Sequence, residues 1–210
     1  MTITWYGEGS FKIQTGETSL LTDPFDPITG LTPPRFKPQI ILKTLNAIAD
    51  LSAKDAKNRD GLSINGAGEY NLRGINILGI PLTEESTGKF LKTIYILEAE
   101  DIRLCLLGHL SEAPETATLQ KIGEIDILFI PAGGKPFLDQ KSSFKLVKQI
   151  EPKIVIPSFF KLPGLKRPAA DVQTFLDEVN HKKIDSQEKL SIKSKELRES
   201  KSMQIAVLKI

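Results

Sequence analysis

The chain has 210 residues, 40% of them hydrophobic, with 28 Lys and Arg against 26 Asp and Glu, which gives a formal net charge of +2. This length suits one folded domain spanning residues 1–210 with a sizeable core, and so small a net charge gives no indication of a nucleic-acid or membrane partner. The single cysteine, Cys105, excludes disulfides within the chain and thiolate zinc clusters.

The cellular setting is predicted from three features of the composition. The first ten residues contain neither a basic leader nor an apolar run, and no stretch approaches the roughly 18 consecutive apolar residues of a membrane span. Residues 181–201 hold seven Lys and Arg against four Asp and Glu, which favours a solvated face over a phosphate-binding patch. We therefore expect a cytoplasmic protein that does not enter membranes and does not bind nucleic acid.

Short strands dominate the first half of the chain, because Gly, Pro and Asp clusters separate the alternating apolar runs. The expected strands cover residues 2–6, 10–14, 19–22, 40–43, 69–72, 75–80, 93–98 and 102–107. Gly-containing turns in FKIQTGETSLLTDP and INGAGEYNLRGINILGIP predict two antiparallel hairpins. Residues 46–58 are rich in Ala and Lys and predict a short helix.

Helical periodicity becomes frequent in the second half of the chain. Helices are expected over residues 113–122, 140–150 and 168–179. Buried strands are expected over residues 125–130 and 154–157, and the closing run MQIAVLKI predicts a last strand. Hairpins interleaved with helices predict an α/β (α+β) fold in which helices cover two stacked sheets.

Several segments, in their order along the chain, resemble the metallo-β-lactamase superfamily. TWYGEGSFKI and LLTDPFDP are similar to its first strand, turn and Asp-Pro-Phe, and NGAGEYNLRGINILGIP is similar to its Gly-Pro-Gly-Glu-Tyr hairpin. TIYILEAEDIRLCLLGHL, IGEIDILFIPAGG and EPKIVIPSFFKLPGLK follow in the family's order. The resemblance is to the small bacterial and archaeal zinc-dependent hydrolases like the ascorbate-phosphate lactonase group. It implies a prokaryotic protein with a four-layer αββα sandwich of the metallo-β-lactamase type.

The resemblance also implies a two-metal site, because hydrolysis on this fold uses a water activated by bound divalent ions. The family's His-x-His-x-Asp-His motif falls on Leu45, Ala47, Ala49 and Asp50. Three of these four side chains are aliphatic and offer no lone pair to a metal. The motif is therefore degenerate in this chain.

The other family ligands fall on equally altered positions. The histidine of the first turn falls on Glu8, a later histidine near Glu84, the bridging aspartate on His109 and the last histidine on Phe159. Zinc takes about four nitrogen, sulfur or oxygen ligands. We therefore expect the zinc site to be lost and no cofactor to be bound, with a weak Mg or Mn site as the alternative.

Six residues are candidates for the vestigial pocket. They are Glu8, Asp23, Asp50, Glu69, His109 and Phe159. His109 is expected to be a neutral histidine hydrogen-bonded to a carboxylate such as Asp23, with a metal ligand or a general base as the alternative. Asp23 is more often a turn or capping residue than a catalytic one, and Glu69 is more often a residue that orders its hairpin.

Three functions are compatible with these residues. The main expectation is a noncatalytic, metal-free pseudoenzyme that binds an unknown small molecule or protein. The alternative is a divergent metal-dependent hydrolase of phosphoesters or lactones, with a rebuilt site of Asp23, Asp50, Glu69 and His109. The third is a nucleic-acid or anion binder. A homo-oligomer is compatible with each of them.

Overall fold

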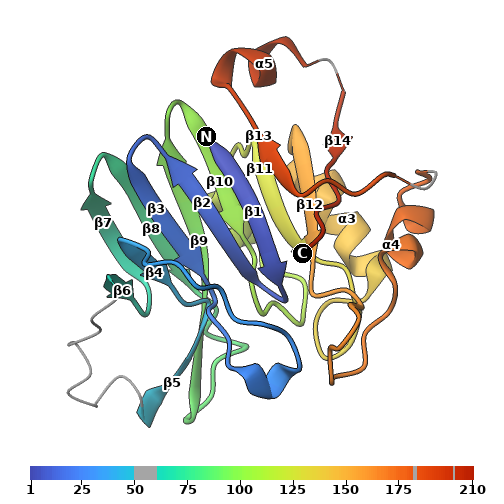
Figure 1. Cartoon of the computed structure of the whole chain (residues 1–210), viewed down its shortest axis with the longest axis horizontal. Helices are drawn as coiled ribbons and strands as arrows, with labels where there is room; N and C mark the ends of the chain where they lie inside the picture. The colour runs from blue at the N-terminus through green and yellow to red at the C-terminus, as the bar shows by residue number, and fades with distance from the viewer. Residues whose placement is uncertain (50–60, 182–183, 201) are drawn as a thin grey trace.

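Two β-sheets lie face to face in the computed structural model, which describes residues 1–49, 61–181, 184–200 and 202–210 (Figure 1). The strands of the first sheet, in order across it, are β13 (Lys189–Ser191), β1 (Thr2–Gly7), β2 (Ser10–Thr15), β3 (Thr18–Thr22), β4 (Ile40–Leu42) and β6 (Leu62–Ile64). Side chains of β1 alternate between half-buried and buried positions, as expected for a strand with one face toward the core. β4 runs parallel to β3.

The second sheet combines antiparallel and parallel strands. In order across it they are β14 (Gln204–Ile205), β12 (Ile154–Ser158), β11 (Ile127–Pro131), β10 (Ile102–Leu106), β9 (Phe90–Ala99), β8 (Ile75–Pro81) and β7 (Gly68–Leu72), with β5 (Leu45–Ala47) also paired to β9. β10, β11 and β12 are parallel to one another. Every residue of β11 and β12 is buried, which explains their continuous apolar sequences.

The described helices are short and are placed beside the sheets. They are η1 (Pro27–Thr29), α2 (Thr116–Ile122), α3 (Gln140–Ile150), α4 (Val172–Glu178) and α5 (Ser194–Glu199). α3 begins where the carboxylate of Asp139 accepts a hydrogen bond of 2.9 Å from the Ser142 amide, and it packs against β11 and α4 (Figure 1). None of the described helices has the length and apolarity needed to cross a membrane.

Aromatic rings join the two sheets in the core. The ring centroids of Phe11 and Phe129 are 4.7 Å apart, and those of Trp5 and Phe160 are 4.5 Å apart. All four side chains are buried. Burying a ring of this size stabilises the folded chain by about 1.5–3 kcal/mol, so these pairs are a substantial part of what holds the sheets together.

The expected α/β sandwich is confirmed, together with both hairpins and the helix over residues 140–150. Other boundaries differ. Residues 45–47 form strand β5 where a helix was expected to begin, and residues 50–58 of that helix lie outside the described residues. The helices expected from residues 113 and 168 begin later, at Thr116 and Val172, after the extended N-cap residues Glu115 and Asp171. Of the last strand expected in MQIAVLKI, only Gln204–Ile205 forms a strand, β14.

One edge of the sandwich collects the carboxyl ends of β1, β3, β4, β10 and β12. Since β3 and β4 are parallel, as are β10 and β12 through β11, the residues that follow these strands meet there. Three non-glycine residues at this edge have positive φ angles, Glu8 (51°), Asp23 (36°) and Phe159 (57°). Such conformations persist only where surrounding contacts hold them, and they are concentrated at functional sites.

Candidate functional site

A pocket of about 510 Å³ opens at this edge of the sandwich. Its lining includes Glu8, Asp23, Leu45, His109 and Phe159, which come from five separate segments of the chain. The strands therefore bring together residues that are up to about 150 positions apart. Ligand sites of open α/β sheets commonly lie at the carboxyl ends of strands in this way.

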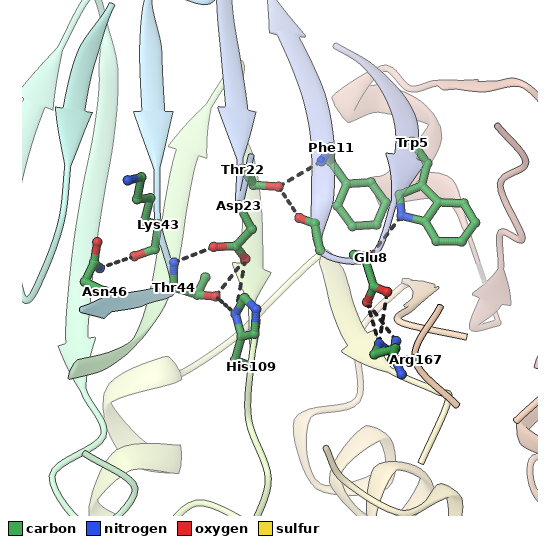
Figure 2. Close-up of polar contacts among 11 residues, drawn as sticks. Trp5, Glu8, Phe11, Thr22, Asp23, Lys43, Thr44, Asn46, His109 and Arg167 are labelled. Carbon is green, nitrogen blue, oxygen red and sulfur yellow. Dashed lines mark hydrogen bonds and ion pairs between the residues drawn. The ribbon is translucent and has the colours of Figure 1, made fainter. Parts of the chain in front are cut away.

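Asp23 lines the pocket and is hydrogen-bonded to Thr44, and both residues are buried (Figure 2). One carboxylate oxygen of Asp23 accepts a hydrogen bond of 2.7 Å from the Thr44 amide, and the other accepts one of 2.7 Å from the Thr44 hydroxyl. The Asp23 amide donates to the carbonyl of Leu42 at 2.8 Å, which ties the end of β3 to the end of β4. Burial raises the pKa of Asp23, and the charge of His109 and the Thr44 hydrogen bonds oppose that rise.

His109 continues this chain toward the pocket. Its Nδ1 atom is 2.8 Å from the Thr44 hydroxyl oxygen and 3.8 Å from the nearer carboxylate oxygen of Asp23. When the hydroxyl proton goes to ionised Asp23, the Thr44 oxygen accepts from Nδ1–H, and Nε2 carries the lone pair. Burial lowers the pKa of His109, which the Asp23 carboxylate opposes. The arrangement favours a neutral imidazole with a basic Nε2.

Glu8 and Arg167 form an ion pair on the other side of the pocket (Figure 2). The Arg167 Nε atom donates to both carboxylate oxygens of Glu8, at 2.9 and 3.0 Å, and Nη2 donates to one of them at 2.7 Å. Nη2 also donates to the carbonyl of Phe159, while the guanidinium carbon lies 5.0 Å from the ring centroid of Phe137. Arg167 therefore fixes both Glu8 and the backbone after β12.

Phe159 contacts both His109 and the guanidinium of Arg167, so its ring lies between the histidine and the Glu8–Arg167 ion pair. Its ring centroid is 5.0 Å from that of His109, and its side chain is buried. A Cβ atom added to Gly9 would lie 2.6 Å from the Phe159 ring and 2.9 Å from an Asp23 carboxylate oxygen, so only glycine fits at that turn. The Gly9 turn is held by Thr22, whose hydroxyl donates to the Gly9 carbonyl at 2.6 Å.

Glu85 fastens the loop that follows His109. It accepts a hydrogen bond of 2.9 Å from the Ser111 amide and one of 2.9 Å from the Glu112 amide, and it also accepts from the Ser111 hydroxyl. The ammonium of Lys92 lies 2.6 Å from the same carboxylate and forms an ion pair with it, so Glu85 joins β9 to the loop after His109.

Four of the six predicted pocket residues come together in the structure. Glu8, Asp23, His109 and Phe159 line the pocket. Glu69 is exposed on β7 and does not line it, and Asp50 lies outside the described residues. Among the described members of the rebuilt site, Asp23 and His109 lie together and Glu69 lies apart from them.

The remaining predicted positions are spread along β5 and its neighbours. Leu45 lines the pocket, as a pocket reshaped by apolar side chains requires. Ala47 of β5 pairs with Phe90 of β9, and Ala49 is exposed. Glu84 is exposed and does not line the pocket, whereas its neighbour Glu85 makes the contacts described above.

Sequence reasoning missed Thr44 and Arg167. Thr44 directly follows a predicted strand that ends at the same edge as Asp23, so a hydroxyl at that strand end was an available indication. Arg167 lies in the Gly- and Pro-containing loop PGLKRP, and its contact with Glu8 joins residues 159 positions apart. Nothing local in the sequence indicates that contact.

Comparisons with known proteins agree with the fold. A family model described as a beta-lactamase superfamily domain matches residues 2–158. A UPF0173 metal-dependent hydrolase of Thermoplasma acidophilum is 24% identical over 82% of this chain and 88% of its own, and a UPF0173 protein of Pyrococcus abyssi is 25% identical over 78% and 85%. A Thermotoga maritima crystal structure described as a Zn-dependent hydrolase of the metallo-β-lactamase superfamily is 25% identical, has a TM-score of 0.78, and is covered over 97% of its length by 99% of this chain.

These relatives correct two expectations drawn from the sequence. The main expectation of a noncatalytic pseudoenzyme is wrong, because the relatives are named hydrolases, and the expectation of no cofactor is wrong, because they are named metal-dependent or Zn-dependent. The inference from lost ligands to lost activity gave too much weight to individual positions. A hydrolase, the stated alternative, agrees better with the comparisons.

The described residues do not themselves fit a metal centre. Within residues 1–49, 61–181, 184–200 and 202–210, no group of three or more His, Cys, Asp or Glu is placed to hold an ion. Both oxygens of Asp23 accept hydrogen bonds from Thr44, and both oxygens of Glu8 face Arg167. The chemistry that these side chains can perform is therefore derived from their own acid–base properties.

Proposed function

This chain belongs to the β-lactamase superfamily, and from that membership we propose that it is a hydrolase whose reaction takes place in the pocket beside His109. The observation that carries the proposal is the hydrogen-bonded chain from Asp23 through Thr44 to His109. A histidine oriented through Nδ1, with Nε2 directed to bound substrate, is a common general base for hydrolysis.

Each member of the chain has a distinct part in the proposed reaction. His109 Nε2 takes a proton from the attacking water, and the Thr44 hydroxyl keeps Nδ1 in the protonated tautomer. Asp23 stabilises the imidazolium that forms, because its carboxylate lies 3.8 Å from Nδ1. The proton then passes from Nε2 to the leaving oxygen. General acid–base catalysis of this kind contributes about 10²–10⁴-fold to a rate.

Aromatic rings cover part of the His109 imidazole, whose side chain stays 21% exposed. The ring of Phe159 packs on one side of the imidazole, and Phe137 lies on another, with ring centroids 5.0 and 5.6 Å away. Burial of the imidazole lowers the pKa of His109, which favours its neutral form. A metal of the kind named for the relatives would supply a Lewis acid, but the described residues do not fit one, so each step above belongs to the side chains alone.

Further parts of the proposal concern the setting of this reaction. We propose that the chain works as a single domain, residues 1–210, in the cytoplasm of a prokaryotic cell and acts on a small molecule. The archaeal and bacterial sources of the relatives support the prokaryotic setting. The buried thiol of Cys105 agrees with a reducing compartment.

Hydrolysis of chromogenic substrates tests the proposal. The purified full chain is assayed with p-nitrophenyl phosphate, bis-p-nitrophenyl phosphate, p-nitrophenyl esters and an aliphatic lactone. We expect turnover of at least one, and a loss of about 10²-fold or more in His109→Gln. Leu62→Ser, an exposed position on β6 away from the pocket, is the matched control. Turnover unchanged in His109→Gln, or no turnover of any substrate, would refute the proposal.

A further inference from the structure

Glu85 ties the loop that carries His109 to strand β9. Its carboxylate accepts hydrogen bonds of 2.9 Å from the Ser111 amide and 2.9 Å from the Glu112 amide, so it holds the backbone just after the histidine. The ammonium of Lys92, in β9, donates to the same carboxylate at 2.6 Å and to the Ser111 hydroxyl at 2.8 Å. We call the side chains of Glu85, Lys92 and Ser111 the Glu85 clamp.

The turn that carries Glu85 is fixed to β9 by contacts of its own. The Leu82 amide donates to the Lys92 carbonyl at 3.0 Å, and the Lys92 amide donates to the Ser86 hydroxyl at 3.0 Å. The Ser86 hydroxyl donates in turn to the Leu82 carbonyl at 2.7 Å. Glu85 lies between Leu82 and Ser86, so its carboxylate projects from a supported turn.

The same stretch of β9 also holds Thr44. The Thr93 amide donates to the Thr44 carbonyl at 2.9 Å, and Lys92 is paired with Leu45 across β9 and β5. The Thr44 hydroxyl oxygen is 2.8 Å from Nδ1 of His109. Both partners of the hydrogen bond that orients His109 are therefore tied to Lys92 and Thr93, one through the backbone and the other through the Glu85 clamp.

The Glu85 clamp is an ion pair with little exposure to solvent. The side chains of Glu85 and Lys92 are 9% and 17% exposed. Burial raises the pKa of Glu85, but hydrogen bonds from Lys92 and from the Ser111 and Glu112 groups outweigh it and hold the pKa below its usual value. Glu85 is therefore ionised at neutral pH, and an amide in its place could not accept all of these hydrogen bonds.

Asp126 has similar contacts at the opposite edge of the sheet. Its carboxylate accepts a hydrogen bond of 2.9 Å from the Arg103 amide and lies 2.7 Å from the Lys153 ammonium. Asp126 directly precedes β11, at the amino ends of the parallel strands, and does not line the pocket. It provides a natural comparison, because it has the chemistry of Glu85 without the proximity to His109.

We propose that Glu85 is a positioning residue for His109, which it keeps in register with the Thr44 hydroxyl by clamping the loop of residues 109–112 to β9. The proposal rests on the proposed function, in which His109 is the general base. Glu85 does not line the pocket, so its effect on the reaction passes through the imidazole. A displacement of about 1 Å at a reacting group can lower a rate by about 10²-fold.

Glu85→Gln tests this role, with Asp126→Asn as the matched control. Each change replaces a carboxylate beside a lysine with an amide of the same size. For the p-nitrophenyl substrate that the unchanged chain hydrolyses fastest, we expect Glu85→Gln to lower kcat by about 10- to 10²-fold with KM kept within about twofold. Asp126→Asn should keep both constants within about twofold, although both variants should unfold at lower urea concentration.

The tautomer of His109 gives a second measurement, which does not depend on turnover. The chain has two histidines, so the ring nitrogen signals of His109 are assigned in NMR spectra by comparison with His181→Gln. With a neutral imidazole we expect separate signals for protonated Nδ1 and unprotonated Nε2. In Glu85→Gln they should move toward one another as the other tautomer becomes populated, and in Asp126→Asn they should stay apart.

Ser111→Ala keeps the test open if Glu85→Gln does not fold. It removes one hydroxyl of the Glu85 clamp and leaves the Ser111 amide and the ion pair in place. We expect kcat to fall by about two- to fivefold, and no further loss when Ser111→Ala is added to Glu85→Gln. Unaltered kcat and His109 signals in Ser111→Ala, with Glu85→Gln unfolded, would overturn the proposal.

The two measurements distinguish this proposal from the proposed function. If the unchanged chain hydrolyses no substrate, hydrolysis fails while the His109 signals still test the Glu85 clamp. Moved signals without a change in kcat support the clamp and count against His109 as the base. Unmoved signals in folded Glu85→Gln, or an equal loss of kcat in Asp126→Asn, overturn the positioning role and leave hydrolysis standing.

Discussion

Gly108 approaches Thr44 so closely that a Cβ atom at Gly108 would lie 2.1 Å from the Thr44 hydroxyl oxygen. Gly108 also has a φ angle of 56°, in the left-handed region that glycine accepts most readily. The residue before His109 is thus packed against the hydroxyl that orients His109. A side chain at this position would disturb both the backbone and the hydrogen-bonded chain.

Gly108→Ala should therefore destabilise the protein and reduce hydrolysis together. The left-handed conformation costs about 1–2 kcal/mol for alanine, and the overlap with Thr44 adds about 1–3 kcal/mol. Urea unfolding and steady-state turnover measure the two effects. Gly16→Ala is the matched control, because Gly16 has a φ angle of 52° but no atom within 4 Å of an added Cβ. Equal effects of the two substitutions would contradict the role assigned to the contact with Thr44.

Removal of the Thr44 hydroxyl should uncouple His109 from Asp23. Thr44→Val keeps the shape of the side chain but leaves an Asp23 oxygen and His109 Nδ1 without their partner, at a cost of about 1–3 kcal/mol in the free energy of unfolding. We expect turnover to fall as well, because the Nδ1 tautomer is no longer fixed. Thr44→Ser keeps a hydroxyl and should therefore retain most of the stability and most of the turnover. If Thr44→Ser retained stability but not turnover, the hydroxyl would have a structural role only.

The lowered pKa of His109 predicts a specific pH dependence of stability. Burial, opposed by Asp23, lowers the pKa below 6.5, so the unfolded chain takes up a proton before the folded one as the pH falls. The free energy of unfolding should therefore fall as the pH drops below about 6.5, and His109→Gln should show a smaller fall. Denaturant titrations between about pH 5 and pH 8 provide the comparison. Parallel curves for the two proteins would contradict the burial effect.

Chelation tests the metal dependence that the relatives' names indicate. A reaction carried by the side chains alone should keep its turnover after dialysis against EDTA, whereas the metal dependence named for the relatives would lower turnover by about tenfold or more, with recovery on addition of Zn or Mn. Metal content measured before and after dialysis shows whether an ion was present. Turnover that is insensitive to EDTA, in a protein that carries no metal, would show that this chain departs from its relatives.

The ion pair between Glu8 and Arg167 should contribute to stability through the segment after β12. Arg167→Met leaves a largely buried carboxylate unpaired, and we expect a loss of about 1–3 kcal/mol in the free energy of unfolding, less than for a fully buried pair because of solvent screening. Glu8→Gln combined with Arg167→Met should be less harmful than the sum of the two single changes. A double-mutant cycle by urea unfolding measures this coupling, and additive losses would show that the pair is not coupled.

Elements with long apolar runs were predictable from the sequence, and short or distant contacts were not. β11 and β12 are recognisable because parallel, fully buried strands have continuous apolar sequences. β5 and β6 have three residues each, too few to establish a period, so they were missed.

The candidate site divides in the same way. His109 was expected to be hydrogen-bonded to a carboxylate such as Asp23; in the structure the two lie 3.8 Å apart and the Thr44 hydroxyl makes a hydrogen bond to each. Arg167 could not be predicted, because its position depends on where the chain returns after β12. The error about activity came from equating ligand loss at single positions with loss of function.

The backbone contact between Gly30 and Gly164 shows that the mouth of the pocket is built by loops from both halves of the chain. The region that matches the superfamily ends at residue 158, before Leu165 and Arg167. A polypeptide cut at that point would keep His109 and Asp23 but would lack one wall. Activity should consequently be assayed on the uncut polypeptide, and proteolytic nicking of the 159–171 connection should abolish substrate selectivity before it unfolds the sheets.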